Sequence, residues 1–374
     1  MTDITGQRIL STLAADGTLT IELAPLRLPA PNSNQIAVRV EAAPINPSDL
    51  ALLFGTADTN DATYSPGKII GRMAEGATRA MKGRHGVSLP VGNECAGTVI
   101  AAGESPAAQA LLGKQVGCVP GTAFATHAVA DAQMAIVLPD DASAEQGASC
   151  FVNPMTALGF VETMKRDGFT GIVHTAAASN LGQMLVRICA ADGVPLVNIV
   201  RNPAQVAILE ELGSDDVLDS TAPGFMKKLT AAIERTGAMM AFDPIRGGTL
   251  GSQIIGAMEA AASRANTTAS FTVYGSSKPK KLYVYGGLDL GPMIFNPGFD
   301  FAWQMGGWLL PYFLATAGPE VAARMRARVR AELTTTFASH YKGSVSLDTM
   351  LTREAVSAYN ARRTGEKYLL LPNS

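Results

Sequence analysis

Two patterns of apolar residues divide the chain. From residue 7 to about residue 138, short stretches are separated by Gly and Pro, and residues 35–40 (Q-I-A-V-R-V) alternate between apolar and polar. A period of two indicates half-buried strands. From about residue 151, short apolar runs are followed by stretches in which apolar residues recur with helical spacing. The sequence therefore predicts a β-rich part followed by an α/β part.

The α/β part is typical of a doubly wound parallel sheet. Helices that stop at glycine alternate with short buried strands, which favours crossover connections and parallel pairing. The expected strands lie at 172–173, 196–200, 217–218, 238–242 and 282–286, and the expected helices at 203–212, 223–235 and 250–262. The polar residues 263–277 form a long connection. Because ligands bind beyond the carboxyl ends of such strands, one crevice is expected to be lined by Thr175, Arg201, Asp243 and the turn Gly286-Gly287.

The β-rich part contains one helix and one irregular excursion. A helix is expected to begin near Leu50, and residues 55–89 are interpreted as an excursion without regular structure. Near the C-terminus we expect helices over 319–333 and 353–362, and strands at 345–347 and 367–371. Such a chain end plausibly returns to the first part. The predicted domains are therefore 1–150 with 310–374, and 151–309.

Composition supports a well-buried globular protein of two domains. The chain has 374 residues, of which 47% are hydrophobic and 17% charged, with a net charge of −2. This balance does not favour a nucleic-acid partner. The four cysteines form no C-x-x-C pair, which indicates neither a zinc lobe nor a disulfide framework. Without a signal pattern or an apolar run of about 20 residues, we expect a soluble cytoplasmic protein that does not enter membranes.

One small-residue turn predicts a dinucleotide site. Residues 176–182 (A-A-A-S-N-L-G) join an expected strand to an expected helix, with Ala177-x-Ser179-x-x-Gly182 in the frame of the G-x-G-x-x-G fingerprint. Small side chains let backbone N–H groups approach a pyrophosphate at a helix N-terminus. The expected contacts are Ala177, Ser179, Asn180, Leu181 and Gly182. The pattern alone also fits an ordinary strand-to-helix turn, so its context decides.

Arg201 supplies that context. It closes the second expected strand, about 20 residues after the turn, where the adenosine ribose is recognised. A carboxylate there would select NAD, whereas a guanidinium suits the 2′-phosphate of NADP. The alternative is a solvated arginine at a strand end. We interpret the cofactor as NADPH.

Asn46 is a candidate ligand-facing residue. It stands between Pro44 and Pro47, which fix the backbone around it and could aim its amide. The alternative is a helix cap, in which Asn46 and Asp49 satisfy the start of the next helix. From the residues alone, the cap is the simpler interpretation.

Together these residues resemble the zinc-free quinone oxidoreductase and enoyl reductase branch of the medium-chain dehydrogenase/reductase superfamily. Three motifs carry the resemblance: A-P-I-N-P-S-D at 43–49, N-P-M-T-A at 153–157 and the turn at 177–182. The resemblance implies a Rossmann domain beside a β-rich GroES-like catalytic domain. It implies that Asn46 and Thr156 lie beside the nicotinamide with Asn153 nearby, and that Arg201 takes the 2′-phosphate. It also implies a homodimer that pairs edge strands near residues 282–295.

The same comparison implies that no zinc is bound. The zinc-dependent branch has a cysteine where this chain has Asn46, and a G-H-E run where it has Gly92-Asn93-Glu94. Neither amide replaces the thiolate or imidazole that catalytic zinc prefers. Enoyl-thioester reductases of the zinc-free branch carry a tyrosine soon after the N-P-S-D helix. The nearest one here, Tyr64, is displaced into the excursion.

The predicted reaction is hydride transfer from NADPH to a quinone or an α,β-unsaturated carbonyl. The protein must stabilise the oxygen on which charge develops, and Asn46, Tyr64 and backbone N–H groups are the candidate donors. His174, in the fingerprint strand, is interpreted as a core histidine. One alternative is an enoyl-thioester (trans-2-enoyl-CoA) reductase. Another, of a different class, is a non-catalytic NADPH-binding redox sensor or structural protein.

Overall fold

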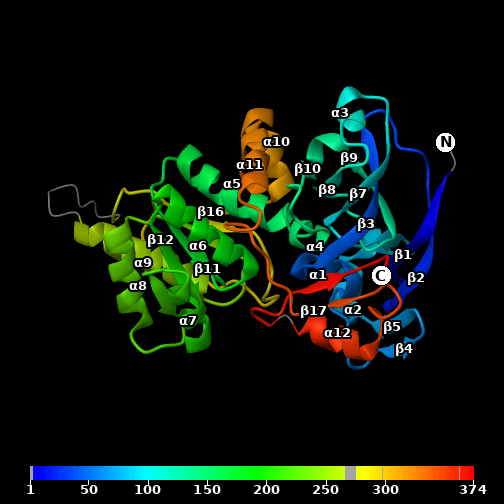
Figure 1. Cartoon of the computed structure of the whole chain (residues 1–374). Helices are drawn as coiled ribbons and strands as arrows, with labels where there is room; N and C mark the ends of the chain where they lie inside the picture. Colours follow the sequence, from blue (N-terminus) through cyan, green and yellow to red (C-terminus); the bar gives the residue numbers. More distant parts are fainter. Residues whose placement is uncertain (1–2, 266–274, 297, 362) are drawn as a thin grey trace. The chain divides into compact units, whose positions relative to one another are not determined.

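The chain forms two compact units, residues 1–152 with 326–374 and residues 153–325. The computed structural model in Figure 1 describes residues 3–265, 275–296, 298–361 and 363–374. The sequence instead places the second boundary at 309/310, so the observed second unit takes in residues 310–325. The first of these is called unit 1 and the second unit 2.

Unit 1 is rich in β structure, as the alternating pattern predicts. Its strands are β1 Ile4–Leu13, β2 Thr18–Leu28, β3 Gln35–Ile45, β4 Thr63–Ser65, β5 Lys68–Arg72, β6 Ser88–Pro90, β7 Cys95–Ala102, β8 Gln115–Cys118, β9 His127–Asp131, β10 Ile136–Val137, β17 Gly343–Val345 and β18 Tyr368–Leu370. Its helices are α1 Pro47–Phe54, α2 Glu75–Ala80, η1 Lys82–Arg84, α3 Pro106–Gln109, η2 Ala132–Met134, α4 Ala144–Gly147 and α12 Arg353–Asn360. Helix α11 Pro319–Ala331 crosses from unit 2 into unit 1.

The strands of unit 1 form two sheets, with the orders β4-β5-β2-β1-β6 and β10-β8-β7-β3-β18-β17, and β9 also pairs with β3. The last strand, β18, runs antiparallel to β3, with Tyr368 opposite Ile45. The end of the chain is therefore built into a sheet formed by its beginning.

The prediction of an irregular excursion over 55–89 is wrong. This stretch contains β4, β5, α2, η1 and β6, and β5 pairs with β2 so that Ile69 lies opposite Ile21. Both isoleucines are 1% exposed. The strands escaped prediction because each is only three to five residues long, too short to show a period.

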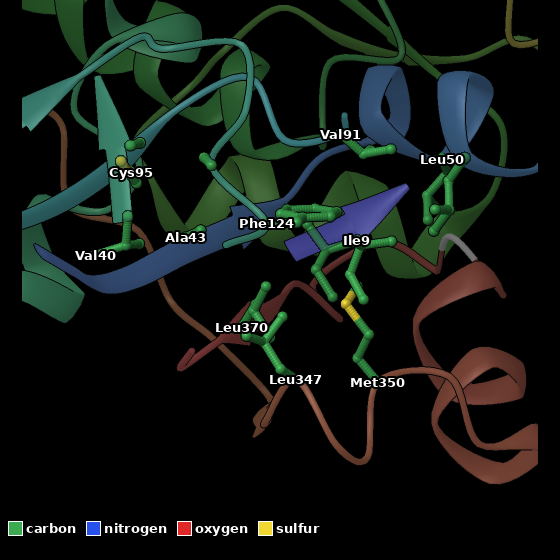
Figure 2. Packing of buried hydrophobic residues seen from close by; sticks show 14 of the residues in the cluster. Ile9, Val40, Ala43, Leu50, Val91, Cys95, Phe124, Leu347, Met350 and Leu370 are labelled. Carbon is green, nitrogen blue, oxygen red and sulfur yellow. The ribbon is translucent and has the colours of Figure 1, made fainter. Parts of the chain in front are cut away.

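The core of unit 1 joins residues that are far apart in the sequence. Figure 2 shows Leu347 and Met350, from the C-terminal segment, packed near Ile9, Phe124 and Leu370. All five are at most 3% exposed. Burial of such side chains contributes about 1.5–3 kcal/mol each. The C-terminal segment is therefore part of the core and not an appendage.

Unit 2 contains a parallel sheet with the order β13-β12-β11-β14-β15-β16. Its strands are β11 Ile172–Thr175, β12 Leu196–Val200, β13 Val217–Asp219, β14 Met240–Asp243, β15 Lys280–Val284 and β16 Trp303–Gly307. Its helices are α5 Val152–Arg166 (from its second residue), α6 Asn180–Asp192, α7 Pro203–Glu211, α8 Phe225–Thr236, α9 Leu250–Ala265 and α10 Leu310–Ala317. Numbered from β11, this is the 3-2-1-4-5-6 order of the Rossmann fold, which confirms the predicted fold class.

Helices cover both faces of this sheet. Ile199 belongs to an apolar cluster with residues of α8 and α9, whereas its neighbour Val200 clusters with Val186 of α6 and Leu209 of α7. Consecutive residues of a strand point to opposite faces. The apolar runs in these strands are therefore continuous because both sides are buried.

Two differences from the predicted strands have physical reasons. The strand expected at 282–286 is β15, which spans 280–284. Its first residue, Lys280, is charged and therefore resembles a surface residue in the sequence, but it is buried in an ion pair with Glu259 (2.6 Å). Strand β16 and helix α10 were not predicted; β16 contains Gln and two Gly and shows no apolar period.

Of the predicted connection 263–277, residues 266–274 lie outside the described residues. None of the described helices has the length and apolar character needed to cross a bilayer.

Candidate functional site

The turn between β11 and α6 is shaped by one close approach. The backbone reverses at Ala176, whose φ of 51° is in the left-handed region. Gly182 then packs so tightly that a Cβ on it would lie 2.0 Å from the carbonyl oxygen of Ala177. Any side chain at 182 would force the turn apart. The glycine of the fingerprint is therefore required by the contact between helix and turn.

Ser179 begins α6 as its N-cap. Its side-chain oxygen accepts a hydrogen bond from the backbone N–H of Gly182 (3.2 Å). Ala177 is fully buried, and Asn180 and Leu181 are half-buried on the first turn. The N–H groups of a first helical turn point out of the helix end, where they favour an anion. The turn thus has the form that a pyrophosphate needs.

Thr175 and Asp243 lie at the carboxyl ends of adjacent strands, β11 and β14, and bond each other. The Thr175 hydroxyl donates to Asp243 Oδ1, which also accepts from the backbone N–H of Ile245 (3.0 Å). Asp243 Oδ2 accepts from the N–H of Arg246 (2.9 Å). Both Asp243 oxygens are thus engaged within the protein. The pair lies between β11 and β14, where the strand order reverses. Ligands of this fold usually bind at that position.

The predicted glycine turn follows β15 at the same edge. A Cβ on Gly286 would lie 2.8 Å from the carbonyl oxygen of Pro244, whereas Gly287 has more room. The N–H of Leu288 donates to the Pro244 carbonyl (3.0 Å). The turn is therefore held close to the end of β14, and Gly286 permits that approach.

Arg201 follows the last residue of β12 and is exposed. Its backbone N–H donates to Gln205 Oε1 (3.1 Å), while Asn202 caps α7. Within the described ranges, the guanidinium forms no ion pair with the protein. Arg201 is thus an exposed cation at this strand end, and its contact with a 2′-phosphate stays a prediction.

His174 is a core residue, as the sequence indicates. It is fully buried, and its Nε2 forms a 2.7 Å hydrogen bond with the hydroxyl of Tyr285. Burial lowers the pKa of His174 to about 3. The ring is therefore neutral at physiological pH and does not act as a cation.

Asn46 lies in a buried polar network of unit 1. It precedes α1, and its backbone N–H donates to Asp49 Oδ2 (2.9 Å). Its side-chain Nδ2 donates to Glu94 Oε1 (3.0 Å), and Glu94 Oε2 accepts from the backbone N–H groups of Phe151 (3.0 Å) and Val152 (2.8 Å). The backbone bond to Asp49 fits the helix-cap interpretation, and the side chain is held by Glu94; that the amide faces a ligand stays a prediction.

Lys367 is the buried cation of this network, and the sequence did not single it out. Its Nζ donates to Ser149 Oγ (2.7 Å), which also accepts from the Tyr341 hydroxyl (2.7 Å). Burial lowers the pKa of Lys367 to about 8, against the opposing attraction of Glu94 and Asp49. Burial raises the pKa of Asp49 to about 7 and also raises that of Glu94. Two carboxyl groups and one ammonium thus share a low-dielectric site.

Tyr64 is held within its own segment. Its hydroxyl donates to the Thr59 carbonyl (2.8 Å), and the Arg353 guanidinium lies 4.4 Å from its ring centroid. Arg353 also donates to the carbonyls of Asn60 (2.8 Å) and Ala62 (2.9 Å). The hydroxyl proton is therefore already used, which weighs against the predicted role of Tyr64 as a donor to substrate.

The structure groups some predicted residues and leaves others separate. The cofactor candidates, except Asn153, gather at the carboxyl edge of the unit 2 sheet. Asn153 and Thr156 lie in the first turns of α5, where Thr156 is buried and Asn153 half-buried. Asn46 and Tyr64 belong to unit 1, in different local networks. The network residues Glu94 and Lys367 were missed as functional candidates because no local pattern connects residues 46, 94 and 367.

The Rossmann unit and the β-rich unit together give a fold that solved structures share. Their fold is that of the medium-chain dehydrogenase/reductases, with Rossmann and GroES-like domains. The homologues and structural neighbours of the chain are quinone oxidoreductase and enoyl reductase members of this superfamily, which confirms the resemblance read from the sequence. No family model matches the chain.

Particular relatives fall into two groups. The mitochondrial enoyl-[acyl-carrier-protein] reductase of Rattus norvegicus is 28% identical over 54% of this chain and 50% of its own length. The chloroplastic quinone-oxidoreductase homolog of Spinacia oleracea is 27% identical over 55% of this chain and 59% of its own length. The chain thus spans about half the length of the curated relatives it matches.

Solved structures share the fold over the whole chain. A candidate NADPH:quinone reductase from Mesorhizobium loti superposes with a TM-score of 0.74 at 23% identity, covering 100% of both chains. A mycobacterial protein solved in complex with NADPH gives a TM-score of 0.66 at 18% identity, covering 98% of this chain and 100% of its own.

Proposed function

We propose that the protein is a zinc-independent, NADPH-dependent oxidoreductase that transfers hydride to a small-molecule quinone or α,β-unsaturated carbonyl. The observation that carries the proposal is the strand β11, its tight turn to α6 and the free Arg201 after β12. This combination supports a dinucleotide with a 2′-phosphate. The relatives named above support the class of reaction.

The cofactor would be held by residues of unit 2. Ala177, Ser179, Asn180, Leu181 and Gly182 would face the pyrophosphate, and Arg201 the 2′-phosphate. Thr175, Asp243, Gly286 and Gly287 would line the crevice, and Asn153 would lie near the nicotinamide. When bound, NADPH supplies the hydride.

Asn46 and Thr156 are the proposed catalytic residues. An amide and a hydroxyl can orient a ligand and stabilise the oxygen on which charge develops, a task that a metal-free site assigns to aimed hydrogen bonds. Asn46 is well prepared, because Glu94 fixes its amide. Tyr64 stays a weaker candidate, since its hydroxyl is bonded to Thr59.

An enoyl-thioester reductase is the second candidate. It is favoured by the similarity to mitochondrial enoyl-[acyl-carrier-protein] reductases. It is opposed by the lack of a tyrosine directly after α1 and by the way Tyr64 is bonded. The two activities differ in acceptor: the first reduces benzoquinone or a simple enone, and the second reduces crotonyl-CoA.

The proposal predicts that Arg201→Ala weakens NADPH binding selectively. Loss of a charge-assisted contact costs about 1.5–3 kcal/mol, or roughly tenfold to a hundredfold in dissociation constant. NADH binding should change by less than about twofold, because NADH lacks the 2′-phosphate. Fluorescence titration with both cofactors measures the two constants. Arg264→Ala, which removes another exposed arginine of unit 2, is the matched control.

Turnover is measured separately as NADPH oxidation with benzoquinone, a simple enone and crotonyl-CoA. Reduction of quinone or enone supports the first function, and reduction of crotonyl-CoA alone selects the second. If NADPH binds and none of these acceptors reacts, the result favours the sensor or structural alternative. Equal loss of NADPH and NADH affinity in Arg201→Ala would contradict the role of Arg201.

Three further features stay predictions: the absence of zinc, a cytoplasmic location and a homodimer. The curated relatives include mitochondrial and chloroplastic proteins, so they do not assign a compartment. The homodimer is expected to form at the edge of the unit 2 sheet.

A further inference from the structure

The amide of Asn46 is oriented by a carboxylate whose oxygens are both occupied. Glu94 accepts Asn46 Nδ2–H on Oε1 and two backbone N–H groups on Oε2. Three donors on one carboxyl group match the ionised form, because a protonated carboxyl would bring a fourth donor to the same place. Asn46 and Glu94 are 3% and 1% exposed. An ionised carboxylate buried this deeply needs a nearby cation.

Lys367 is placed to be that cation by strand register. In the antiparallel pairing of β3 with β18, Ala43 faces Leu370 and Ile45 faces Tyr368. Asn46 directly follows β3 and Lys367 directly precedes β18, so the two residues flank the last pair of this ladder. The sheet therefore brings the backbone of Lys367 to the end of β3, where α1 begins.

The ammonium is fixed by neutral partners. Ser149 Oγ accepts from both Lys367 Nζ and the Tyr341 hydroxyl, and Nζ lies 5.8 Å from the centroid of the Tyr341 ring. Both contacts leave the positive charge uncompensated locally. The buried carboxyl groups of Glu94 and Asp49 raise the pKa of Lys367 and so partly oppose the effect of burial.

We propose that Lys367 is a positioning residue: its ammonium keeps Glu94 ionised, and Glu94 in turn fixes which end of the Asn46 amide faces the reaction site. Ser149 and Tyr341 hold the ammonium in place. Without Lys367, Glu94 takes up a proton, its oxygens no longer select Nδ2 over Oδ1, and the Asn46 amide is free to turn. The catalytic consequence rests on the proposed function; the orientation of Asn46 does not.

The orientation is tested by NMR of protein labelled with ¹⁵N at asparagine side chains. The Asn46 Nδ2 signal is identified by its loss in Asn46→Ala. We expect it to shift or broaden in Lys367→Met and in Glu94→Gln, and to stay in place in Lys342→Met, which removes a half-exposed lysine paired with Glu366 nearby. An unmoved Asn46 signal in folded Lys367→Met, or in Glu94→Gln if Lys367→Met does not fold, overturns the proposal.

The catalytic consequence is tested by a double-mutant cycle. Lys367→Met should lower kcat by about tenfold or more, leave the NADPH dissociation constant within about twofold, and have no further effect on kcat in an Asn46→Ala background. Lys367→Arg, which keeps the cation, should recover kcat to within about threefold of the wild type. If the losses of kcat in Lys367→Met and Asn46→Ala add up in the double variant, the two residues act independently and the proposal is wrong. A lower unfolding temperature of Lys367→Met with unchanged kcat would show that Lys367 has only a structural role. If the wild type turns over no acceptor, the proposed function fails while the NMR result still decides the orientation.

Discussion

At the scale of single residues, the interior of this protein contains several polar side chains besides its apolar ones. His174 and Lys280 are at most 2% exposed, yet each has a specific partner, Tyr285 and Glu259. A buried polar group is tolerated only when it is hydrogen-bonded or paired. Such groups make folding depend on protonation, and His174 gives a clear sign for that dependence.

We expect His174 to destabilise the protein in acid. Its pKa is about 3 when folded and about 6.5 when unfolded, so between these values the unfolded chain binds more protons and stability falls as the pH is lowered. Relative to about pH 7, the loss at about pH 5 is about 2 kcal/mol. His174→Gln should remove this part of the loss in urea unfolding, with exposed His340→Gln as the control. Parallel stability curves for wild type and His174→Gln would show that His174 does not titrate in this range.

At the scale of elements, the strand–turn–helix unit of β11 and α6 depends on Gly182. In Gly182→Ala, the new Cβ would meet the Ala177 carbonyl, so the turn must open. Overpacking of this kind costs about 1–3 kcal/mol. We therefore expect a lower unfolding temperature and about tenfold weaker NADPH binding by titration. Gly76→Ala, where a Cβ meets nothing within 4 Å, should change neither quantity for the worse.

The same element shows what sequence can predict. The runs that become β11, β12 and β14 are buried on both faces, so their apolar pattern is continuous and visible. The start of β15 at Lys280 was not predicted, because a charged residue is buried there only through its ion pair with Glu259. Strand β16 was not predicted, because this edge strand is partly exposed and has no apolar pattern. The Asn46 network could not be predicted, because strand pairing, not local sequence, joins Lys367 to Asn46 and Glu94. A local motif is enough to locate the turn between β11 and α6, whereas the charged residues around Asn46 can be identified only once the fold is known.

At the scale of the whole molecule, the open edge of the unit 2 sheet is the feature that most needs a partner. In the described part of the chain, β16 pairs with β15 alone and leaves its other side without a strand. Apolar side chains on and around it are exposed: Met305 by 49%, Leu309 by 64%, Tyr312 by 72% and Phe301 by 79%. An open apolar edge promotes association unless it is covered. The prediction placed the edge strands near residues 282–295, but the strand there, β15, lies between β14 and β16, so the edge strand is β16 instead.

We therefore expect two copies to pair through β16, giving twice the chain mass of 39.0 kDa by light scattering. Replacing Met305 and Leu309 together by Asp places like charges opposite each other across a two-fold axis, where the same patch meets itself. The double variant should be monomeric with an unchanged far-UV spectrum. Leu112→Asp, at a 50% exposed leucine of unit 1, should remain dimeric. A wild-type monomer at micromolar concentration would contradict the dimer, and a dimeric double variant would move the interface away from β16.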